Sequence, residues 1–212
     1  QKGGGILTQE DLASYEPRIS EPITGSYDDY TIATAATPCG GLTVLETLNI
    51  LENFDLRSMG HNTAEYLHTL IESARHAFAD RYRFLGDWEY ANVPLGGLLS
   101  KEYAREIAKQ VDPDKAILEP MLNQEPWVHY LERAIHDPWK YDHGTCPRAM
   151  PSRSSLTSSE DGTTHFNVVD KDRNVVSCTH TADFSAGVVP PGTGFYLSPG
   201  MNWFVAKPGH PN

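Results

Sequence analysis

Cysteine is scarce in this sequence, and basic residues are outnumbered. Cys39, Cys146 and Cys178 are the three cysteines among 212 residues, too few and too scattered for a disulfide framework or a zinc cluster. Lys and Arg number 17 against 28 Asp and Glu, which gives a net charge of −11. A chain without a basic excess cannot neutralise many phosphates, so the composition argues against nucleic acid as a partner.

Long apolar runs and several familiar motifs are also missing. No stretch approaches the roughly 18–20 apolar residues that a membrane-spanning helix needs, so we expect no membrane span. The sequence has no GxxxxGK[ST] phosphate loop and no GxSxG nucleophile elbow. Its nine histidines include no HExxH pair, and we expect them to be surface or packed side chains. We therefore expect neither a metal nor an organic cofactor.

The order of the predicted elements indicates an α+β fold or a layered α/β fold, because helices come first and strands follow a linker. Thr8 is placed to cap a short helix that ends at Tyr15–Pro17, and residues 23–36 indicate two short extended pieces with a turn over 25–30. Longer helices are predicted from 42 to about 54, after Asn62 or Thr63, and from 101 to 111 with Ser100 as cap. The apolar positions expected to face the core are Leu42, Leu45, Leu48, Leu51 and Phe54, widened by Val44 and Ile50, and on the next helix Ala64, Leu67, Leu70, Ile71, Ala74, Ala77 and Phe78.

The second half of the chain changes character. Residues 86–97 and 112–160 are predicted to be mostly loop, with a short helix over 127–135, and the serine-rich stretch 152–162 is typical of an exposed linker. Two β-rich segments, 164–169 and 175–181, predict a hairpin. If Asp170 pairs with Val175, Thr181 lies opposite Thr164. In that register Thr163 and Thr181 fall on opposite faces unless a bulge or the free strand end turns one of them.

The junction between linker and hairpin carries a family resemblance. The segment from Thr163 to Asn174 is similar to the TTHxxVVDxxGN signature of the γ-glutamyltranspeptidases, which are N-terminal-nucleophile hydrolases, with Arg173 in place of the usual Gly. Residues 4–12 resemble the family's GG-(hydrophobic)₂-T-x-x-DL segment, and residues 48–55 and 77–81 resemble helices of its large subunit. The resemblance spans nearly the whole chain. It implies a four-layer αββα sandwich, with 1–162 at the end of the large subunit and 163–212 at the start of the small subunit.

The resemblance also implies the chemistry. Thr163 attacks the carbonyl of Gly162, an N→O acyl shift gives an ester, and water cleaves it, so that Thr163 becomes a new N-terminus. Gly162 has no side chain to obstruct the attack. The freed α-amino group has a reference pKa near 7.7–8 and can serve as the base for the Thr163 hydroxyl. Thr181 matches a family threonine that hydrogen-bonds the nucleophile.

Three positions depart from the family pattern for substrate binding. Asp183 stands where the family commonly has an Asn that contacts the substrate's α-carboxylate, and a carboxylate there repels another unless a cation intervenes. Gly200 and Trp203 occupy positions where a polar residue and an acid normally hold the glutamyl α-amino group. The resemblance therefore favours an acyl-enzyme on Thr163 more strongly than it favours γ-glutamyl amides such as glutathione.

Two alternatives stay open at this point. The first is the same chemistry on another amide, of the cephalosporin or glutaryl acylase type or the oxamate amidohydrolase type. The second is a binding protein of the same fold that never processes. The resemblance further implies a periplasmic or secreted location and a partnership between the two subunits after cleavage. It also implies family parts outside this sequence, namely an arginine before Gln1 and a Ser-Ser pair and Gly-Gly oxyanion hole after Asn212.

Overall fold

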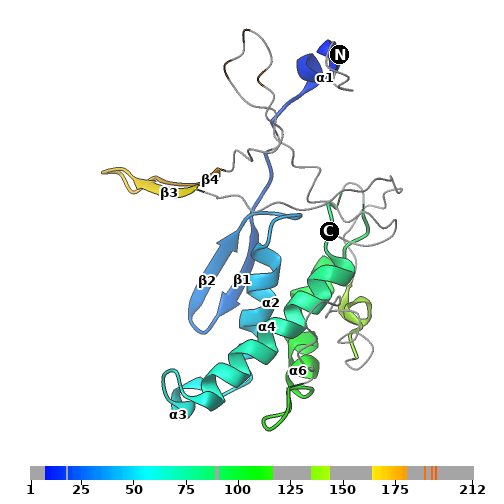
Figure 1. Cartoon of the computed structure of the whole chain (residues 1–212), viewed down its shortest axis with the longest axis vertical. Coiled ribbons are helices and arrows are strands. Elements are labelled where there is room, and N and C mark those ends of the chain that lie inside the picture. Colours follow the sequence, from blue (N-terminus) through cyan, green and yellow to red (C-terminus); the bar gives the residue numbers. More distant parts are fainter. Residues whose placement is uncertain are drawn as a thin grey trace. The chain divides into compact units, whose positions relative to one another are not determined.

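The computed structural model describes residues 8–17, 19–88, 91–116, 135–143 and 164–180, with residues 189, 192 and 194. The elements in chain order are α1 (Gln9–Ser14), β1 (Ile23–Tyr27), β2 (Tyr30–Thr34), α2 (Gly41–Leu51), α3 (Leu56–Met59), α4 (Ala64–Phe84), α5 (Leu95–Leu98), α6 (Lys101–Ala108), the 3₁₀ helix η1 (Pro138–Tyr141), β3 (Thr164–Val169) and β4 (Val175–His180) (Figure 1). This mixed content confirms the α+β expectation. The predicted helix over 127–135, except for its last residue, and the linker over 152–162 lie outside the described residues.

Contacts divide the chain into two compact units. The first comprises residues 1–78 and 94–145, and the second comprises 79–93 and 146–212. This division follows packing, whereas the predicted boundary at 162/163 concerns the cleavage of one peptide bond and stays a prediction. Among the described residues, the first unit contains the two-stranded antiparallel sheet β1–β2 and the second contains β3–β4. The four-layer sandwich is an expectation for the whole protein.

Helix starts follow local chemistry closely. The Thr8 side chain accepts a hydrogen bond from the Asp11 amide, and the Asp11 carboxylate accepts one from the Thr8 amide, which completes a capping box. Ser100 accepts from the amides of Glu102 and Tyr103 at the start of α6. Both caps were predicted from the sequence and are confirmed. The four-residue elements α3, α5 and η1 were not predicted, because one turn has too little periodicity to detect.

The core of the first unit lies where α2 packs against α6 and β1 (Figure 1). The side chains buried there are Leu42, Leu45, Ile50, Leu51, Tyr103 and Ile107. Val44, expected to widen the apolar stripe of α2, is 56% exposed instead. The β1–β2 turn is also tighter than expected. Gly25 to Tyr27 stay in the strand, where they pair with residues 30–32, and Asp28 takes a positive φ of 51° in the short turn that follows.

Helix α4 contradicts most of the predicted core face, although Ala77, which was also predicted, is fully buried. The expected apolar residues Leu67, Ile71 and Phe78 are 40%, 49% and 40% exposed. The buried row is instead mainly polar, and its polar members are Thr69, Glu72, Ser73, His76 and Asp80. Periodicity correctly identified the helix, but the face that it buries is decided by polar partners on other segments.

No helix among the described residues is long and apolar enough to cross a membrane.

The contact between α5 and η1 yields a stability test with a matched control. A Cβ on Gly97 would lie 1.9 Å from the backbone oxygen of Pro138, whereas one on Gly96 would lie 2.9 Å from a side-chain oxygen of Asp142, which can rotate away. Both changes to alanine gain similar helix propensity. In the full-length protein we expect Gly97→Ala to lower stability by about 1–3 kcal/mol relative to Gly96→Ala, because backbone atoms must move. Thermal unfolding checks this, and an equal Tm for the two variants contradicts it.

Candidate functional site

The six residues predicted for the site lie outside the described part of the chain. They are Gly162, Thr163, Thr181, Asp183, Gly200 and Trp203. Their roles therefore stay predictions. The described hairpin β3–β4 nevertheless begins at Thr164 and ends at His180, directly beside two of them. Its geometry is the strongest structural information on the candidate site.

The turn of the hairpin is built around Asp170. Its Oδ1 accepts hydrogen bonds from the amides of Asp172 and Asn174, each 2.9 Å long, and its Oδ2 accepts from Asn174 Nδ2 at 2.8 Å. Hydrogen bonds from the Asn174 side chain and then its backbone are the main causes that hold the pKa of Asp170 below its ordinary value. The Asp170 amide also donates to the Asn174 carbonyl at 3.1 Å, so Asp170 and Asn174 close the turn across a three-residue loop.

This turn corrects the predicted register by one residue. Val169 pairs with Val175, and Thr164 pairs with His180, so the numbers of every pair add to 344. The register predicted from a pairing of Asp170 with Val175 is therefore wrong. The reason is that Arg173 adopts a left-handed conformation, with φ of 65°, which lets the loop close on Asn174. A non-glycine residue rarely takes this conformation, so the sequence alone did not indicate it.

The register sorts the hairpin side chains onto two faces. One face carries His165 and Asn167 from β3 opposite Thr179 and Ser177 from β4. The other face carries Thr164, Phe166, Val168, Val176, Cys178 and His180. One face is therefore polar toward the open end of the hairpin, and the other is mainly apolar.

The polar face is organised around the His165 ring. Nδ1 lies 2.7 Å from Thr179 Oγ1, while Nε2 lies 3.2 Å from Asn167 Oδ1 and 3.3 Å from Ser177 Oγ. A neutral ring satisfies these contacts when Nε2–H donates to the Asn167 carbonyl oxygen and Nδ1 accepts from the Thr179 hydroxyl. This network holds the ring and orients the Thr179 hydroxyl. The His165–Thr179 pair is the second described pair from the open end of the hairpin.

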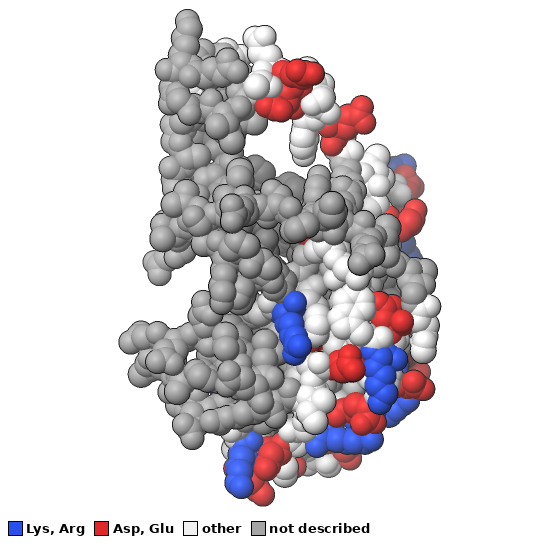
Figure 2. All heavy atoms as spheres, turned by 90° about the vertical axis from the view of Figure 1, so that its right-hand side faces the viewer, with Lys and Arg blue, Asp and Glu red and all other residues white. Residues whose placement is uncertain are grey.

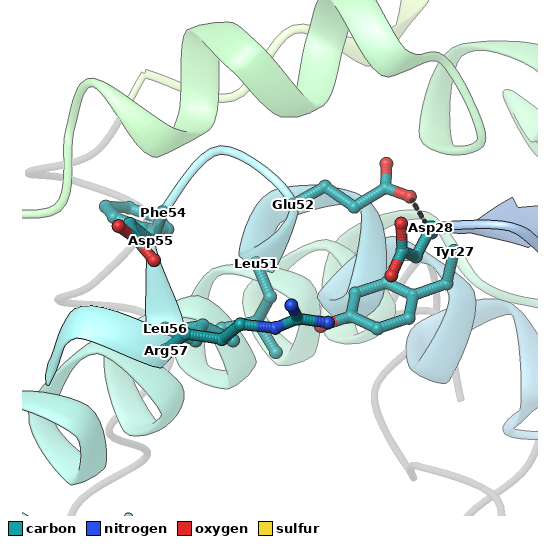
Figure 3. Close-up of a pocket in the computed structure, with 8 residues that line it drawn as sticks. All are labelled: Tyr27, Asp28, Leu51, Glu52, Phe54, Asp55, Leu56 and Arg57. Carbon is teal, nitrogen blue, oxygen red and sulfur yellow. Dashed lines mark hydrogen bonds between the residues drawn. The ribbon is translucent and has the colours of Figure 1, made fainter. Parts of the chain in front are cut away.

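A separate hollow of about 540 Å³ lies in the first unit (Figure 3). Its lining residues are Tyr27, Asp28, Leu51, Glu52, Phe54, Asp55, Leu56 and Arg57. Glu52 is already occupied, since its Oε1 accepts from the Asp28 amide at 2.8 Å and its Oε2 pairs with Lys101. No serine, threonine or cysteine lines the hollow, so it offers no nucleophile for acyl transfer. The hairpin remains the better candidate.

Sequence reasoning missed one buried cluster of polar side chains. His76 Nδ1 lies 3.0 Å from His136 Nε2, and His136 Nδ1 lies 3.3 Å from the Tyr103 hydroxyl. His76 sits in the polar row of α4, which periodicity could have indicated. Its partner is 60 residues away in the sequence, and no local pattern could have found it. Within the described residues, no group of three His, Cys, Asp or Glu side chains is placed to hold a metal ion.

On the face drawn in Figure 2, acidic and basic side chains lie close together over the lower part, whereas the top carries acidic side chains alone. On α6 such neighbours form ion pairs, since Arg105 pairs with Glu102 at 3.8 Å and Lys109 pairs with Glu106 at 2.7 Å. Exposed pairs of this kind contribute little to stability. They offer no basic surface for a polyanion.

Comparisons with known proteins identify relatives along the whole chain. The model of the family described as Gamma-glutamyltranspeptidase matches residues 1–212. The chain is 36% identical to a Glutathione hydrolase proenzyme of Escherichia coli (strain K12) over 215 aligned residues, which cover 100% of the chain and 32% of that protein. It is 33% identical to an Acylase ACY 1 proenzyme of Pseudomonas sp. (strain SE83), covering 97% of the chain and 32% of that relative.

A solved structure supports the same relationship. The crystal structure of Helicobacter pylori gamma-glutamyltranspeptidase matches with a TM-score of 0.51 and 38% identity, over 53% of this chain and 32% of that one. The chain thus spans about a third of the length of the relatives it matches.

The left-handed Arg173 yields a prediction about the hairpin. Replacing Arg173 with glycine removes the strain of a positive φ, worth about 1–2 kcal/mol, and adds about 0.5–1 kcal/mol of backbone entropy cost. We therefore expect Arg173→Gly to raise the stability of the full-length protein by up to about 1 kcal/mol, measured by thermal unfolding. Lys171→Gly is the matched control, because Lys171 has no positive φ, and it should lower stability. Destabilisation by Arg173→Gly would contradict the left-handed conformation of Arg173 in this turn.

Proposed function

The chain belongs to the gamma-glutamyltranspeptidase family, and on this premise we propose that it is part of a self-processing N-terminal-threonine amide hydrolase and acyltransferase. Thr163 is its nucleophile and Thr181 is the hydroxyl that supports it. Homologues named as proenzymes support a processed protein. The observation that carries the proposal at the level of residues is the register of the β3–β4 hairpin.

The register supports the pairing of these two threonines. Every described pair adds to 344, and so do 163 and 181. One further pair at the open end of the hairpin would therefore set Thr163 directly opposite Thr181 on the same face, with no bulge. The two types of antiparallel pair alternate, so this pair is of the same type as His165 with Thr179. In that described pair the side chains already lie within hydrogen-bonding distance, at 2.7 Å.

His165 and Thr179 give this face a second role in the proposal. They form the nearest described pair on the same face, two residues along each strand from Thr163 and Thr181. Asn167 and Ser177 contact the His165 ring, and the ring in turn contacts the Thr179 hydroxyl. We assign these four side chains a positioning role, which keeps the face beside the nucleophile polar and ordered.

Maturation follows from the placement of Thr163. Its Oγ attacks the carbonyl carbon of Gly162, the C–N bond breaks, and the acyl group passes to oxygen as an ester. Water then hydrolyses that ester to a Gly162 carboxylate and a Thr163 alcohol with a free α-amine. The α-amine, with its reference pKa near 7.7–8, takes the proton of the Thr163 hydroxyl in later turnovers. Each catalytic cycle forms an acyl-enzyme on Thr163 Oγ, releases an amine, and passes the acyl group to water or to an acceptor amine.

The two faces of helix α4 support the proposed four-layer fold of the whole protein. Helix α4 buries a polar row yet exposes Leu67, Ile71 and Phe78 on another face. A helix that is apolar on an exposed face is suited to cover a sheet. We propose that residues 1–162 supply such a helical layer of the large subunit, while 163–212 begin the small subunit with the nucleophile strand. A periplasmic or secreted location belongs to the same proposal, and fractionation of the producing cells tests it.

Processing tests the proposal directly. The full-length protein should yield two polypeptides by intact mass and N-terminal sequencing, the smaller one beginning with Thr163, Thr164 and His165. Thr163→Ala should leave one uncut chain, because it removes the attacking oxygen. Thr164→Ala is the matched control and should still be cut, because Thr164 pairs with His180 on the other face of the hairpin.

Either of two outcomes would contradict this assignment. Cleavage between 162 and 163 in Thr163→Ala would mean that another group attacks Gly162. A wild-type chain that stays whole after prolonged incubation would favour the alternative of a non-processing binding protein.

The substrate is the less constrained part of the proposal. We propose γ-glutamyl amides such as glutathione, on the strength of family membership and relatives named glutathione hydrolases. An acylase relative at 33% identity supports the alternative of another amide. Asp183, Gly200 and Trp203 are the pocket residues that we expect to decide between them. Trp203 cannot pair with the α-ammonium group of a glutamyl substrate, because an indole carries no charge.

Two substrates that differ by one amino group separate the alternatives. γ-Glutamyl-p-nitroanilide carries the α-ammonium group, and glutaryl-p-nitroanilide lacks it. We expect the wild type to turn over the first substrate. Trp203→Asp should raise kcat/KM for it by about tenfold, equivalent to about 1.4 kcal/mol, because a carboxylate then faces the ammonium group. Glutaryl-p-nitroanilide should gain nothing. No γ-glutamyl turnover by a processed protein would overturn the γ-glutamyl assignment while leaving the Thr163 chemistry intact.

A further inference from the structure

A short segment of the first unit is held in place by an unusual set of contacts. Residues 135–143, which contain η1 and are called the strap below, contact α5 and α6. One end of the strap is held by the side chain of Gln110. Gln110 Oε1 accepts from the Ile135 amide at 2.8 Å, and Gln110 Nε2 donates to the Ile135 carbonyl at 2.7 Å. Its middle is held by Pro138, which is buried against Gly97.

The central contact of the strap is a pair of histidines. His136 is buried, 6% exposed, and reaches His76 of α4, which is fully buried. The two facing ring nitrogens are 3.0 Å apart, the rings are stacked with centroids 5.1 Å apart, and the Tyr103 hydroxyl closes the chain on the far side of His136. One nitrogen of the facing pair must donate and the other accept, so the bond needs a proton on one of them and not on both.

Titratable and charged groups surround this pair on each element packed against it. Glu72 and Asp80 lie one turn before and one turn after His76 on α4, and Glu72 is already paired with Arg75 at 2.7 Å. Tyr103 comes from α6, Tyr141 of the strap packs on Tyr103, and Glu46 of α2 is also buried in this unit. Burial, followed by the neighbouring His136, lowers the pKa of His76 from 6.5 to about 3. A proton on His76 therefore opposes the closed arrangement.

We propose that the strap is a pH-sensitive latch. It is closed on α4, α5 and α6 while the His76–His136 pair is neutral, and it is released as the solution is acidified. This device does not depend on the proposed processing or on the substrate. Release exposes both imidazoles to water, where protonation has no desolvation cost. The sign follows from linkage: a group whose pKa is lower in the closed state favours closure fully above its ordinary pKa and progressively less below it.

The size of the effect can be stated for the closing equilibrium. With His76 titrating at its ordinary pKa in the released strap and near 3 in the closed one, closure weakens about tenfold between pH 7.5 and pH 5.5. The latch thus responds at mildly acidic pH, well above the value at which His76 itself titrates in the closed state.

Hydrogen exchange of the full-length protein tests the latch. The probes are the amides of Ile135 and Asp142, which donate to Gln110 Oε1 and to the Trp139 carbonyl. Protection factors, corrected for the intrinsic pH dependence of exchange, should fall about tenfold from pH 7.5 to pH 5.5. The reference amide is Ala104 in α6, which donates to Ser100 and should keep its protection.

Variants decide whether the histidine pair is responsible. His76→Phe should reduce the fall to less than twofold, and His76→Gln, which keeps a neutral hydrogen-bonding group, should do the same if the phenylalanine variant does not fold. His68→Gln is the matched control on the same helix, because His68 bonds the Asp112 carbonyl away from the strap, and it should behave as wild type. Unchanged wild-type protection between the two pH values, or an equal fall in a His76 variant, would overturn the proposal.

Discussion

The hydrogen bonds of one carboxylate set the register of the β3–β4 hairpin. Asp170 holds the amides of Asp172 and Asn174 and the side chain of Asn174, and it closes the loop on Asn174. Because side chains alternate between faces, a shift of one residue at this turn would move every side chain of one strand to the opposite face relative to its partner strand. The pairing of His165 with Thr179, and the proposed pairing of Thr163 with Thr181, both depend on this turn.

Helix α4 illustrates a second constraint, which is that buried polar side chains need partners. Helix α4 places His76 and Glu72 inside, where each needs a partner, since an unpaired buried polar group is costly. Glu72 pairs with Arg75, and His76 pairs with His136 of the strap. The same helix leaves Leu67 and Ile71 exposed on another face. The two faces thus have distinct uses: polar contacts hold a chain segment onto the unit, and apolar side chains are available to a further layer of the protein.

Prediction from sequence succeeded where the cause is local. The caps at Thr8 and Ser100, the strands on either side of Asp170, and the α+β class all follow from short patterns, and the structure confirms them. The family relationship was also predicted, because the signature at the hairpin is contiguous in sequence.

Prediction failed where distant or unusual geometry decides. The register was one residue off, because Arg173 takes a conformation that favours glycine. The buried face of α4 was misassigned, because His136 lies 60 residues from His76. The roles of Thr163, Thr181, Asp183, Gly200 and Trp203 stay predictions, since these residues lie outside the described ranges.

The central claim is that the hairpin register sets Thr163 and Thr181 face to face. Cysteines at both positions test it most directly, in a full-length protein whose Cys39, Cys146 and Cys178 are replaced by serine. Directly opposed strand residues have Cβ atoms about 4.5–5.5 Å apart, and closer in pairs that exchange no backbone hydrogen bonds. This is near the spacing of about 3.5–4.5 Å that a disulfide needs, whereas residues on opposite faces point apart. Mass spectrometry after mild oxidation should show a disulfide in the Thr163→Cys/Thr181→Cys protein and none in Thr164→Cys/Thr181→Cys. A disulfide in the second protein alone would contradict the account.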